Sequence, residues 1–126
     1  MQVRQVMSPI VCSVKMTQSL NSAAHSMNKH DVGAAVVLKG TSLVGIITER
    51  DILRAIAERV DFDRATVADF MVTHVVTAAP NWDVSVAAKE MVNGRFRHLV
   101  VQEGRRTSGM ISVRDLLPIF LDGQGD

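Results

Sequence analysis

Hydrophobic residues recur with helical spacing in two segments of the chain. In each segment, four apolar residues fall at i, i+3, i+4 and i+7, which places them on one face of an amphipathic helix. These residues are Leu20, Ala23, Ala24 and Met27 in the first segment and Val84, Ala87, Ala88 and Met91 in the second. Ser19 and Asp83 stand directly ahead of the stripes, and their side-chain oxygens suit helix N-caps. The pattern predicts two helices that each bury one face.

The first stripe is followed by two apolar runs that flank a glycine turn, and the second stripe is followed by the counterparts of these runs. The runs are 34–38 and 43–47 around Gly40, and 98–102 and 108–112 around Gly104. Runs of this length on either side of a short turn are typical of buried β-hairpins. A second helix is expected after each hairpin. Its apolar residues are Ile52, Leu53 and Ile56 in one case and Leu116, Leu117 and Phe120 in the other.

The two halves of the chain repeat one another. A shift of 64 residues aligns fourteen identical positions between Val3 and Ala57 without a gap, where random composition would give about four. Each copy is expected to form a strand, a helix, two strands and a second helix. We therefore predict two domains, residues 1–60 and 67–126, joined by a polar linker at 61–66.

The predicted fold class is α/β, of the mixed α+β type, with two pseudo-symmetric β-α-β-β-α units packed sheet to sheet. A three-stranded sheet buries one face against its own two helices and leaves the other face without a partner. A single copy of about 60 residues would be only marginally stable alone. The two copies are therefore expected to bury their remaining apolar surface against each other.

Composition excludes several functional classes. The chain has 14 basic and 13 acidic residues, which argues against a basic nucleic-acid arm and against an acidic disordered tail. A single cysteine permits no disulfide framework and no cysteine-rich zinc site, and it favours a reducing compartment. No apolar run approaches the roughly 18 residues of a membrane span. We predict a cytoplasmic protein with no nucleic-acid and no membrane partner.

The candidate chemistry lies where each hairpin meets its second helix. The segments GIITERDIL (45–53) and GMISVRDLL (109–117) place a hydroxyl residue, Thr48 or Ser112, three positions before Asp51 or Asp115. This spacing is that of a helix capping box. It also suits a nucleotide, because a helix N-terminus attracts phosphate and a nearby carboxylate accepts hydrogen bonds from ribose hydroxyls. Capping and ligand binding both remain open interpretations of these residues.

The two copies resemble a tandem pair of CBS domains, a family named after cystathionine β-synthase. The resemblance rests on VMSPIVCSV (6–14) and its echo FMVTHVVTA (70–78), on GIITERD and GMISVRD, on RHLVV (97–101), and on the ungapped duplication. It implies a regulatory module that binds AMP, ADP, ATP, NAD or S-adenosylmethionine in clefts between the paired units. It implies no catalysis, no required cofactor and a homodimer, with output passing to a separate effector protein or through self-association.

The resemblance also suggests roles for individual residues. Asp51 and Asp115 would bind ribose, the hydroxyls of the two junctions would face phosphate, and backbone of the first strand of each copy would face adenine. Arginines are candidate phosphate contacts because a guanidinium fork matches phosphate oxygens. The predicted nucleotide-binding residues are Ser13, Val14, Thr48, Arg50, Asp51, Thr77, Ala78, Arg97, His98, Ser112, Arg114 and Asp115.

The two copies differ around these candidate residues. Arg97 and His98 of the second copy align with Gly33 and Ala34 of the first, so only the second copy offers a basic pair beside its central strand. The two clefts are therefore expected to bind ligand with different affinities, and the second more tightly if Arg97 and His98 face inward. Pro118 lies in the last predicted helix, which we expect to kink or to begin late, displacing the acid near its start.

Other candidate sites have simpler interpretations. His25 and His30 are five residues apart and would point about 140° away from each other on a helix, so no metal site is predicted. Cys12 lies in an apolar strand and is interpreted as a core residue. No nucleophile, base and orienting group fall together, so no enzyme is predicted. The alternative to ligand sensing is an architectural module that self-associates and binds no ligand.

Overall fold

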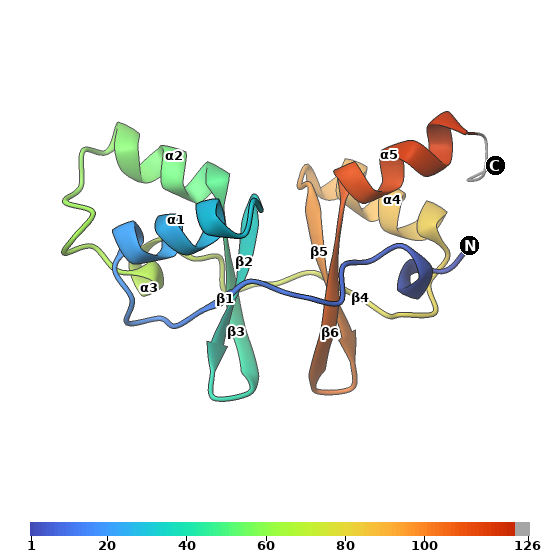
Figure 1. Ribbon diagram of the computed structural model, residues 1–126, viewed down its shortest axis with the longest axis horizontal. Helices are drawn as coiled ribbons and strands as arrows, with labels where there is room; N and C mark the ends of the chain where they lie inside the picture. Colours follow the sequence, from blue (N-terminus) through green and yellow to red (C-terminus); the bar gives the residue numbers. More distant parts are fainter. Residues whose placement is uncertain (123–126) are drawn as a thin grey trace. The chain divides into compact units, whose positions relative to one another are not determined.

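The computed structural model describes residues 1–122 (Figure 1). In chain order its elements are η1 (Val3–Gln5), β1 (Ser13–Val14), α1 (Leu20–Lys29), β2 (Ala34–Lys39), β3 (Ser42–Thr48), α2 (Glu49–Ala57), α3 (Val67–Phe70), β4 (Thr77–Ala78), α4 (Val84–Gly94), β5 (His98–Glu103), β6 (Arg106–Ser112) and α5 (Val113–Leu121). The α+β class and the order of strand, helix, strand, strand and helix in each copy are confirmed. The sequence pattern does not predict the short helices η1 and α3. The last four residues of the predicted second domain, 123–126, lie outside the described residues.

The chain folds into two compact units that cross the sequence repeat. One unit is Val11–Val75, which we call the N-unit, and the other is Met1–Ile10 with Val76–Asp126, which we call the C-unit. Each unit combines the sheet and long helices of one copy with the leading helix of the other copy. The predicted domains follow the repeat, whereas these units follow the packing. The predicted linker at 61–66 lies inside the N-unit, where the Leu20 N–H donates to the Ala65 carbonyl at 2.9 Å.

Both units contain the same three-stranded sheet. In the N-unit, β2 is the central strand, with β1 parallel on one side and β3 antiparallel on the other. The hairpin pairs Ala34 with Thr48 at its open end and turns through Gly40, whose φ of 63° costs a glycine little. In the C-unit, β5 is central and pairs His98 with Ser112 in the equivalent register. The repeat in sequence is therefore a repeat in backbone structure.

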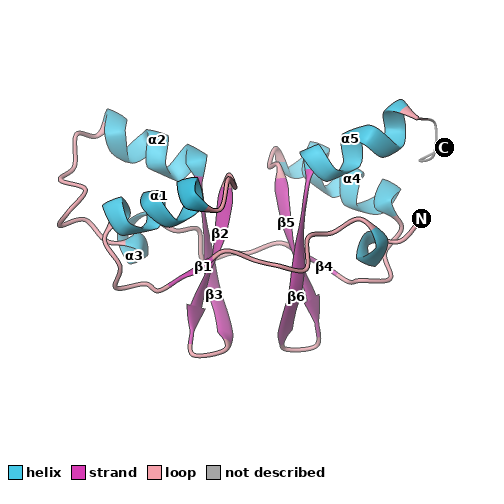
Figure 2. Cartoon of the chain, viewed as in Figure 1, coloured by secondary structure: helices cyan, strands magenta, loops and turns pink. Residues whose placement is uncertain are grey.

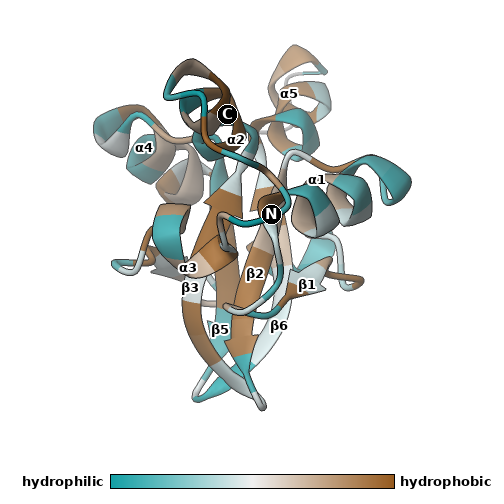
Figure 3. Cartoon of the chain, turned by 90° about the vertical axis from the view of Figure 1, so that its left-hand side faces the viewer, coloured by the Kyte–Doolittle hydropathy of each residue, from teal (hydrophilic) through white to brown (hydrophobic). Residues whose placement is uncertain are grey.

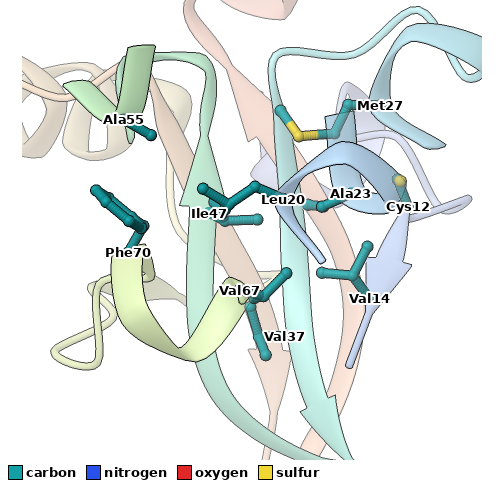
Figure 4. Packing of buried hydrophobic residues seen from close by; sticks show 11 residues of the cluster. Cys12, Val14, Leu20, Ala23, Met27, Val37, Ile47, Ala55, Val67 and Phe70 are labelled. Atoms are coloured by element: carbon teal, nitrogen blue, oxygen red, sulfur yellow. The ribbon is translucent and has the colours of Figure 1, made fainter. Parts of the chain in front are cut away.

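Helices cover one face of the sheet in each unit (Figure 2), and the core lies between the two layers. In the N-unit, Leu20 of α1, Ile47 of β3 and Val67 of α3 are fully buried in one cluster (Figure 4). Leu99 and Ile111 are fully buried in the cluster of the C-unit. The apolar residues Ala34–Leu38 make up most of β2, which is largely coloured as hydrophobic (Figure 3). Burying such side chains contributes about 1.5–3 kcal/mol each before the entropy of ordering them is counted.

Two equivalent glycines lie where the leading segment of one copy packs against the sheet of the other copy. We call these leading segments, which include Ser8 and Val72, the exchanged segments. In the N-unit, a Cβ at Gly45 would lie 2.9 Å from Met71 Sδ and 3.0 Å from the Val72 carbonyl oxygen. In the C-unit, a Cβ at Gly109 would lie only 2.6 Å from the Ser8 carbonyl oxygen. A backbone bridge joins each exchanged segment to the strand beside its glycine. Both glycines are therefore required by close backbone approach and not by turn geometry.

The predicted caps of the first helices are confirmed. Ser19 Oγ accepts a hydrogen bond from the Ser22 N–H at 3.0 Å, and Asp83 accepts one from the Ser85 N–H at 2.9 Å. Each bond satisfies a backbone donor that the first helical turn leaves without a partner. The polar residue ahead of each apolar stripe is therefore accounted for by helix initiation.

The last helix begins where the repeat places it, so the expectation of a late start is wrong. It starts directly after Ser112, and Ser112 and Asp115 form a complete capping box. Pro118 lies in the middle of this nine-residue helix, where it removes one backbone donor. Leu116 and Ile119 bury their side chains on either side of the proline. The cap and this packing keep the residues before and after the proline helical.

Candidate functional site

The first candidate site is the point where β3 ends and α2 begins. We call Thr48, Glu49, Arg50 and Asp51 the first junction. The Thr48 N–H donates to Asp51 Oδ2 at 2.8 Å, and its hydroxyl donates to the same oxygen at 3.2 Å. Glu49 and Arg50 are exposed, whereas Asp51 is only 5% exposed. The capping box indicated by the spacing is present, and it fixes the carboxylate at the start of the helix.

The other oxygen of Asp51 faces Arg54, one turn along the helix. Arg54 Nη2 lies 3.6 Å from Asp51 Oδ1, and the two side chains are 53% and 8% exposed. The same nitrogen donates to the Phe70 carbonyl at 3.1 Å, and the guanidinium carbon lies 5.0 Å from the centroid of the Phe70 ring. Arg54 therefore links the acid to α3 through an ion pair, a hydrogen bond and a cation–π contact.

The second candidate site repeats this geometry in the C-unit. We call Ser112, Val113, Arg114 and Asp115 the second junction. The Ser112 N–H and hydroxyl donate to Asp115 Oδ2 at 2.8 and 3.1 Å. In return, the Asp115 N–H donates to Ser112 Oγ at 3.3 Å. The two junctions thus place a hydroxyl and a carboxylate in the same relation to a helix N-terminus.

Asp115 is more accessible than Asp51. Asp115 is half-buried, and Pro118 stands where the first copy has Arg54. Within residues 1–122, no arginine or lysine forms an ion pair with Asp115. A carboxylate offers about four acceptor positions, and capping uses those of Oδ2. Capping and ligand binding are therefore compatible at Asp115, whereas a ligand at Asp51 would compete with Arg54.

The surroundings of the two junctions differ in charge although their backbones match. The Glu49 N–H donates to the Gly33 carbonyl at 2.9 Å, and the Val113 N–H donates to the Arg97 carbonyl at 2.9 Å. The Glu49 carboxylate lies over Gly33, where a Cβ would be 3.0 Å from Oε1. The equivalent pair in the C-unit is Val113 with an exposed Arg97. The first junction therefore carries an additional negative charge, and the second an additional positive charge.

The C-unit gathers several predicted residues at one end of its sheet. His98 lies opposite Ser112 across the hairpin, and Arg97 directly precedes it. Asp115 is hydrogen-bonded to Ser112, and Arg114 is exposed on the first turn of α5. These four predicted residues and Ser112 therefore lie at the same end of the C-unit sheet. Whether these side chains bind a nucleotide stays a prediction.

The segments predicted to face adenine lie on edge strands. β1 carries Ser13 and Val14 and is separated from β3 by β2, so it lies about 10 Å, two strand spacings, from the strand that leads into the first junction. β4 carries Thr77 and Ala78 in the equivalent place. Val14 and Ala78 are each only 2% exposed as whole residues.

Sequence reasoning missed two residues that shape the first junction. Arg54 follows Asp51 by three positions, a spacing that brings two side chains together on a helix, so the sequence contained this signal. The position of Glu49 over Gly33 depends on the hairpin register and becomes visible only in the structure. Both residues belong to the first copy, and they distinguish it from the second.

Other candidate groups have structural roles. Cys12 is 6% exposed and packs in the N-unit core, as predicted, and burial raises the pKa of its thiol. A raised pKa lowers the thiolate fraction on which cysteine nucleophilicity depends. In the part of the chain that the structure describes, no three His, Cys, Asp or Glu side chains form a group that could hold a metal ion. No helix among residues 1–122 has both the length and the apolar character needed to span a membrane.

Two matches to one family model agree with the duplicated geometry. The model of the CBS domain matches residues 3–58 and again residues 67–122. The chain therefore belongs to the CBS domain family and contains a tandem pair of these domains. A 17.7 kDa protein from Acidianus ambivalens is 35% identical over 123 residues, which cover 96% of this chain and 74% of the relative.

Solved structures share the fold over almost the whole chain. A CBS domain protein from Pyrobaculum aerophilum complexed with AMP has a TM-score of 0.88 and 29% sequence identity, with 97% of each chain covered. The CBS domain pair of protein MJ0100, in complex with 5′-methylthioadenosine and S-adenosyl-L-methionine, has a TM-score of 0.90 and 25% identity, with 98% of each chain covered. Each of these similar proteins binds a ligand that contains adenosine.

Proposed function

We propose that this chain is a non-catalytic regulatory module that binds an adenosine-containing ligand. AMP, ADP, ATP, NAD and S-adenosylmethionine are the candidate ligands, and the occupied state would pass to an effector protein or to the oligomer of the chain itself. We place the module in the cytoplasm, because its single cysteine is buried and a reducing compartment suits it. No cofactor is needed for this function.

The observation that carries the proposal is the repeated junction, with its hydroxyl residue and carboxylate at a helix N-terminus. At the second junction, capping leaves Asp115 Oδ1 as an acceptor for ribose hydroxyls. The N-terminal end of α5 suits a phosphate, while the Ser112 hydroxyl donates its one proton to Asp115. The AMP and S-adenosyl-L-methionine complexes of similar proteins support a ligand of this class.

A thermal-shift screen followed by titration calorimetry tests the proposal. AMP, ATP, NAD and S-adenosylmethionine would each be added at millimolar concentration to the full chain. A ligand at 100 times its dissociation constant should add about 2.7 kcal/mol to the free energy of unfolding. Asp115→Ala and Asp51→Ala should each weaken one site, whereas Glu103→Ala at the hairpin turn should weaken neither. Absence of binding by all four ligands would contradict the proposal.

Exposed apolar residues favour a second function, self-association through the helices. On α5, Leu117, Phe120 and Leu121 are 52%, 38% and 81% exposed, and on α2 Leu53 and Ile56 are 66% and 58% exposed. Apolar residues grouped in this way mark protein interaction surfaces more often than isolated ones do. We propose that the chain forms a homodimer that uses these helix faces. The architectural alternative is that this association is its whole function.

Sedimentation velocity of the full chain separates the two functions. Leu117→Ser should shift the chain from dimer towards monomer, whereas Val92→Ser, at a 77% exposed position of α4, should not. Dimerisation without any adenosyl ligand binding in the calorimeter would support the architectural function alone. A monomeric wild-type chain at micromolar concentration would contradict the homodimer.

A further inference from the structure

We propose that the two junctions select ligands of opposite charge, with Arg97 and Glu49 as the specificity-determining residues. The second junction would take an adenosine compound with a phosphate group. The first would take one that is neutral or positively charged. This inference rests on the proposed function, because it assumes that both junctions bind adenosyl ligands, and it adds the charge that each accepts.

The matched backbone of the two junctions isolates the effect of charge. The first residue of α2, Glu49, and the first residue of α5, Val113, each donate a backbone hydrogen bond of 2.9 Å. The acceptor in each case is the carbonyl of the residue just before the central strand of the sheet. Each junction also has the same hydroxyl and carboxylate in a capping box. Differences in affinity between a charged and an uncharged ligand must therefore come from the side chains around this common backbone.

The first junction supplies its own anion to the helix N-terminus. Glu49 is the first residue of α2, and its carboxylate lies over Gly33 beside the start of the helix. The N-terminal end of a helix dipole favours a negative charge, and here the protein already provides one. Arg54 does not offset it, because its guanidinium is engaged with Asp51 and Phe70. A phosphate at this position would meet two carboxylates and one uncommitted arginine, Arg50.

The second junction has the opposite arrangement. Val113 replaces the glutamate as the first residue of α5, so Asp115 is the acid in the first turn. Arg97 is exposed beside the start of this helix, and Arg114 is exposed on its first turn. A phosphate would therefore meet two arginines and one carboxylate. Guanidinium groups bind phosphate oxygens in a forked geometry, which adds to the effect of charge.

The experiment uses three probes that share adenosine but differ in charge: AMP, adenosine and S-adenosylmethionine. Titration calorimetry of the full chain would compare wild type with Arg97→Gln and Glu49→Gln. Arg97→Gln should weaken AMP binding about fivefold, the size expected for one charge near a phosphate in a largely aqueous dielectric. Adenosine affinity should change less than about twofold, since adenosine has no phosphate. Glu49→Gln should strengthen AMP binding at the weaker site about fivefold and weaken binding of S-adenosylmethionine.

Matched controls remove effects of net charge. Glu103→Gln and Arg106→Gln change the same charges at the turn of the β5–β6 hairpin, at the other end of the sheet from the second junction, and should alter no affinity. A further test gives each junction the two residues that stand at the equivalent positions of the other junction. Arg97→Gly with Val113→Glu should abolish the preference for AMP, and Gly33→Arg with Glu49→Val should create it at the first junction.

The outcomes distinguish this inference from the function on which it rests. Binding of all three probes with an unchanged ratio of AMP to adenosine affinity in Arg97→Gln and Glu49→Gln would overturn charge selection alone. Failure of all three probes to bind wild type at millimolar concentration would overturn the proposed function itself. A changed ratio in the Glu103→Gln control would also overturn the assignment to Glu49 and Arg97.

Discussion

The first and second junctions have the same backbone and different surroundings. Thr48 and Asp51 in one unit, like Ser112 and Asp115 in the other, form a capping box at the start of a nine-residue helix. Yet Asp51 is buried against Arg54, and Asp115 is half-buried with proline in the place of that arginine. The duplicated part of the site is therefore the part that the helix itself requires. The proposed charge selection depends on the part that differs.

The two units also differ in how closely the exchanged segments approach the sheet. In both units a glycine on the third strand admits the segment from the other copy, but the contact is closer at Gly109 than at Gly45. The identity of these glycines across the repeat is explained by packing. It does not by itself indicate a ligand site.

The largest expected effect is on stability, from alanine at the two glycines. Gly109→Ala should lower the free energy of unfolding by about 3 kcal/mol, because its Cβ would lie 2.6 Å from a backbone oxygen. Gly45→Ala should cost about 1–2 kcal/mol, since its closest contact is the flexible end of Met71. Urea unfolding of both variants measures the difference. Equal losses would show that the exchanged segments pack equivalently despite the distances.

The next largest expected effect is on ligand affinity, and it shows whether Asp51 and Asp115 contribute equally to binding. Asp115→Ala should weaken the tighter AMP site about thirtyfold, because charge-assisted hydrogen bonds contribute about 2 kcal/mol. Asp51→Ala should weaken the other site only about threefold, since Arg54 already competes for that carboxylate. Calorimetry measures both constants. Unfolding curves recorded alongside should show a larger loss of stability for Asp51→Ala, because this variant loses the ion pair with Arg54 as well as the cap. A larger affinity loss for Asp51→Ala than for Asp115→Ala would contradict the expected order.

Arg54 itself should have a moderate effect on stability. Arg54→Ala removes the ion pair with Asp51 and both contacts with Phe70, and should destabilise the chain by about 1 kcal/mol after allowance for its half-exposed side chain. Arg64→Ala is the matched control, because Arg64 forms an i,i+3 pair with Asp61 that is exposed on both sides. Its effect should be close to zero. Thermal unfolding measures the loss of stability in both variants. Equal losses for Arg54→Ala and Arg64→Ala would mean that Arg54 does not stabilise the packing of α3.

The smallest expected effect is on the pH dependence of stability, and it comes from the cap at Asp83. Hydrogen bonds from the Ser85 hydroxyl and N–H, with a further contribution from the N-terminal amine, lower the pKa of Asp83 from 3.8 to about 2. Because the folded pKa is depressed, the cap contributes its full stability above pH 3.8 and loses it as the pH falls through about 2. Ser19, the equivalent cap, does not titrate in this range. A carboxyl NMR titration should give the low pKa for Asp83, and a value near 3.8 would contradict it.

The sequence was sufficient to predict most of the fold because periodicity and duplication agree. The helical stripes, the hairpins and the caps at Ser19 and Asp83 all follow from local patterns, and each appears in the structure. The short helices η1 and α3 could not be predicted in the same way. Four residues or fewer carry no periodic signal, and their place in the opposite copy's unit depends on packing over long sequence distances.

The candidate site was predictable only in part. The spacing of Ser112 and Asp115 predicted their hydrogen bonds, because a capping box is a local structure. The late start expected for the last helix is wrong, because the rule for proline in a helix takes no account of the burial of Leu116 and Ile119 beside Pro118. Contacts that depend on register, such as Glu49 over Gly33, required the structure.

We propose that the repeated junction binds adenosyl ligands and that the second copy binds AMP more tightly than the first. An AMP titration followed by backbone amide NMR tests it most directly, because it reports on both junctions of the unmodified chain in one experiment. Amide signals of Ser112–Asp115 should shift at lower AMP concentration than those of Thr48–Asp51. Shifts that appear first at Thr48–Asp51, or at neither junction up to millimolar AMP, would contradict it.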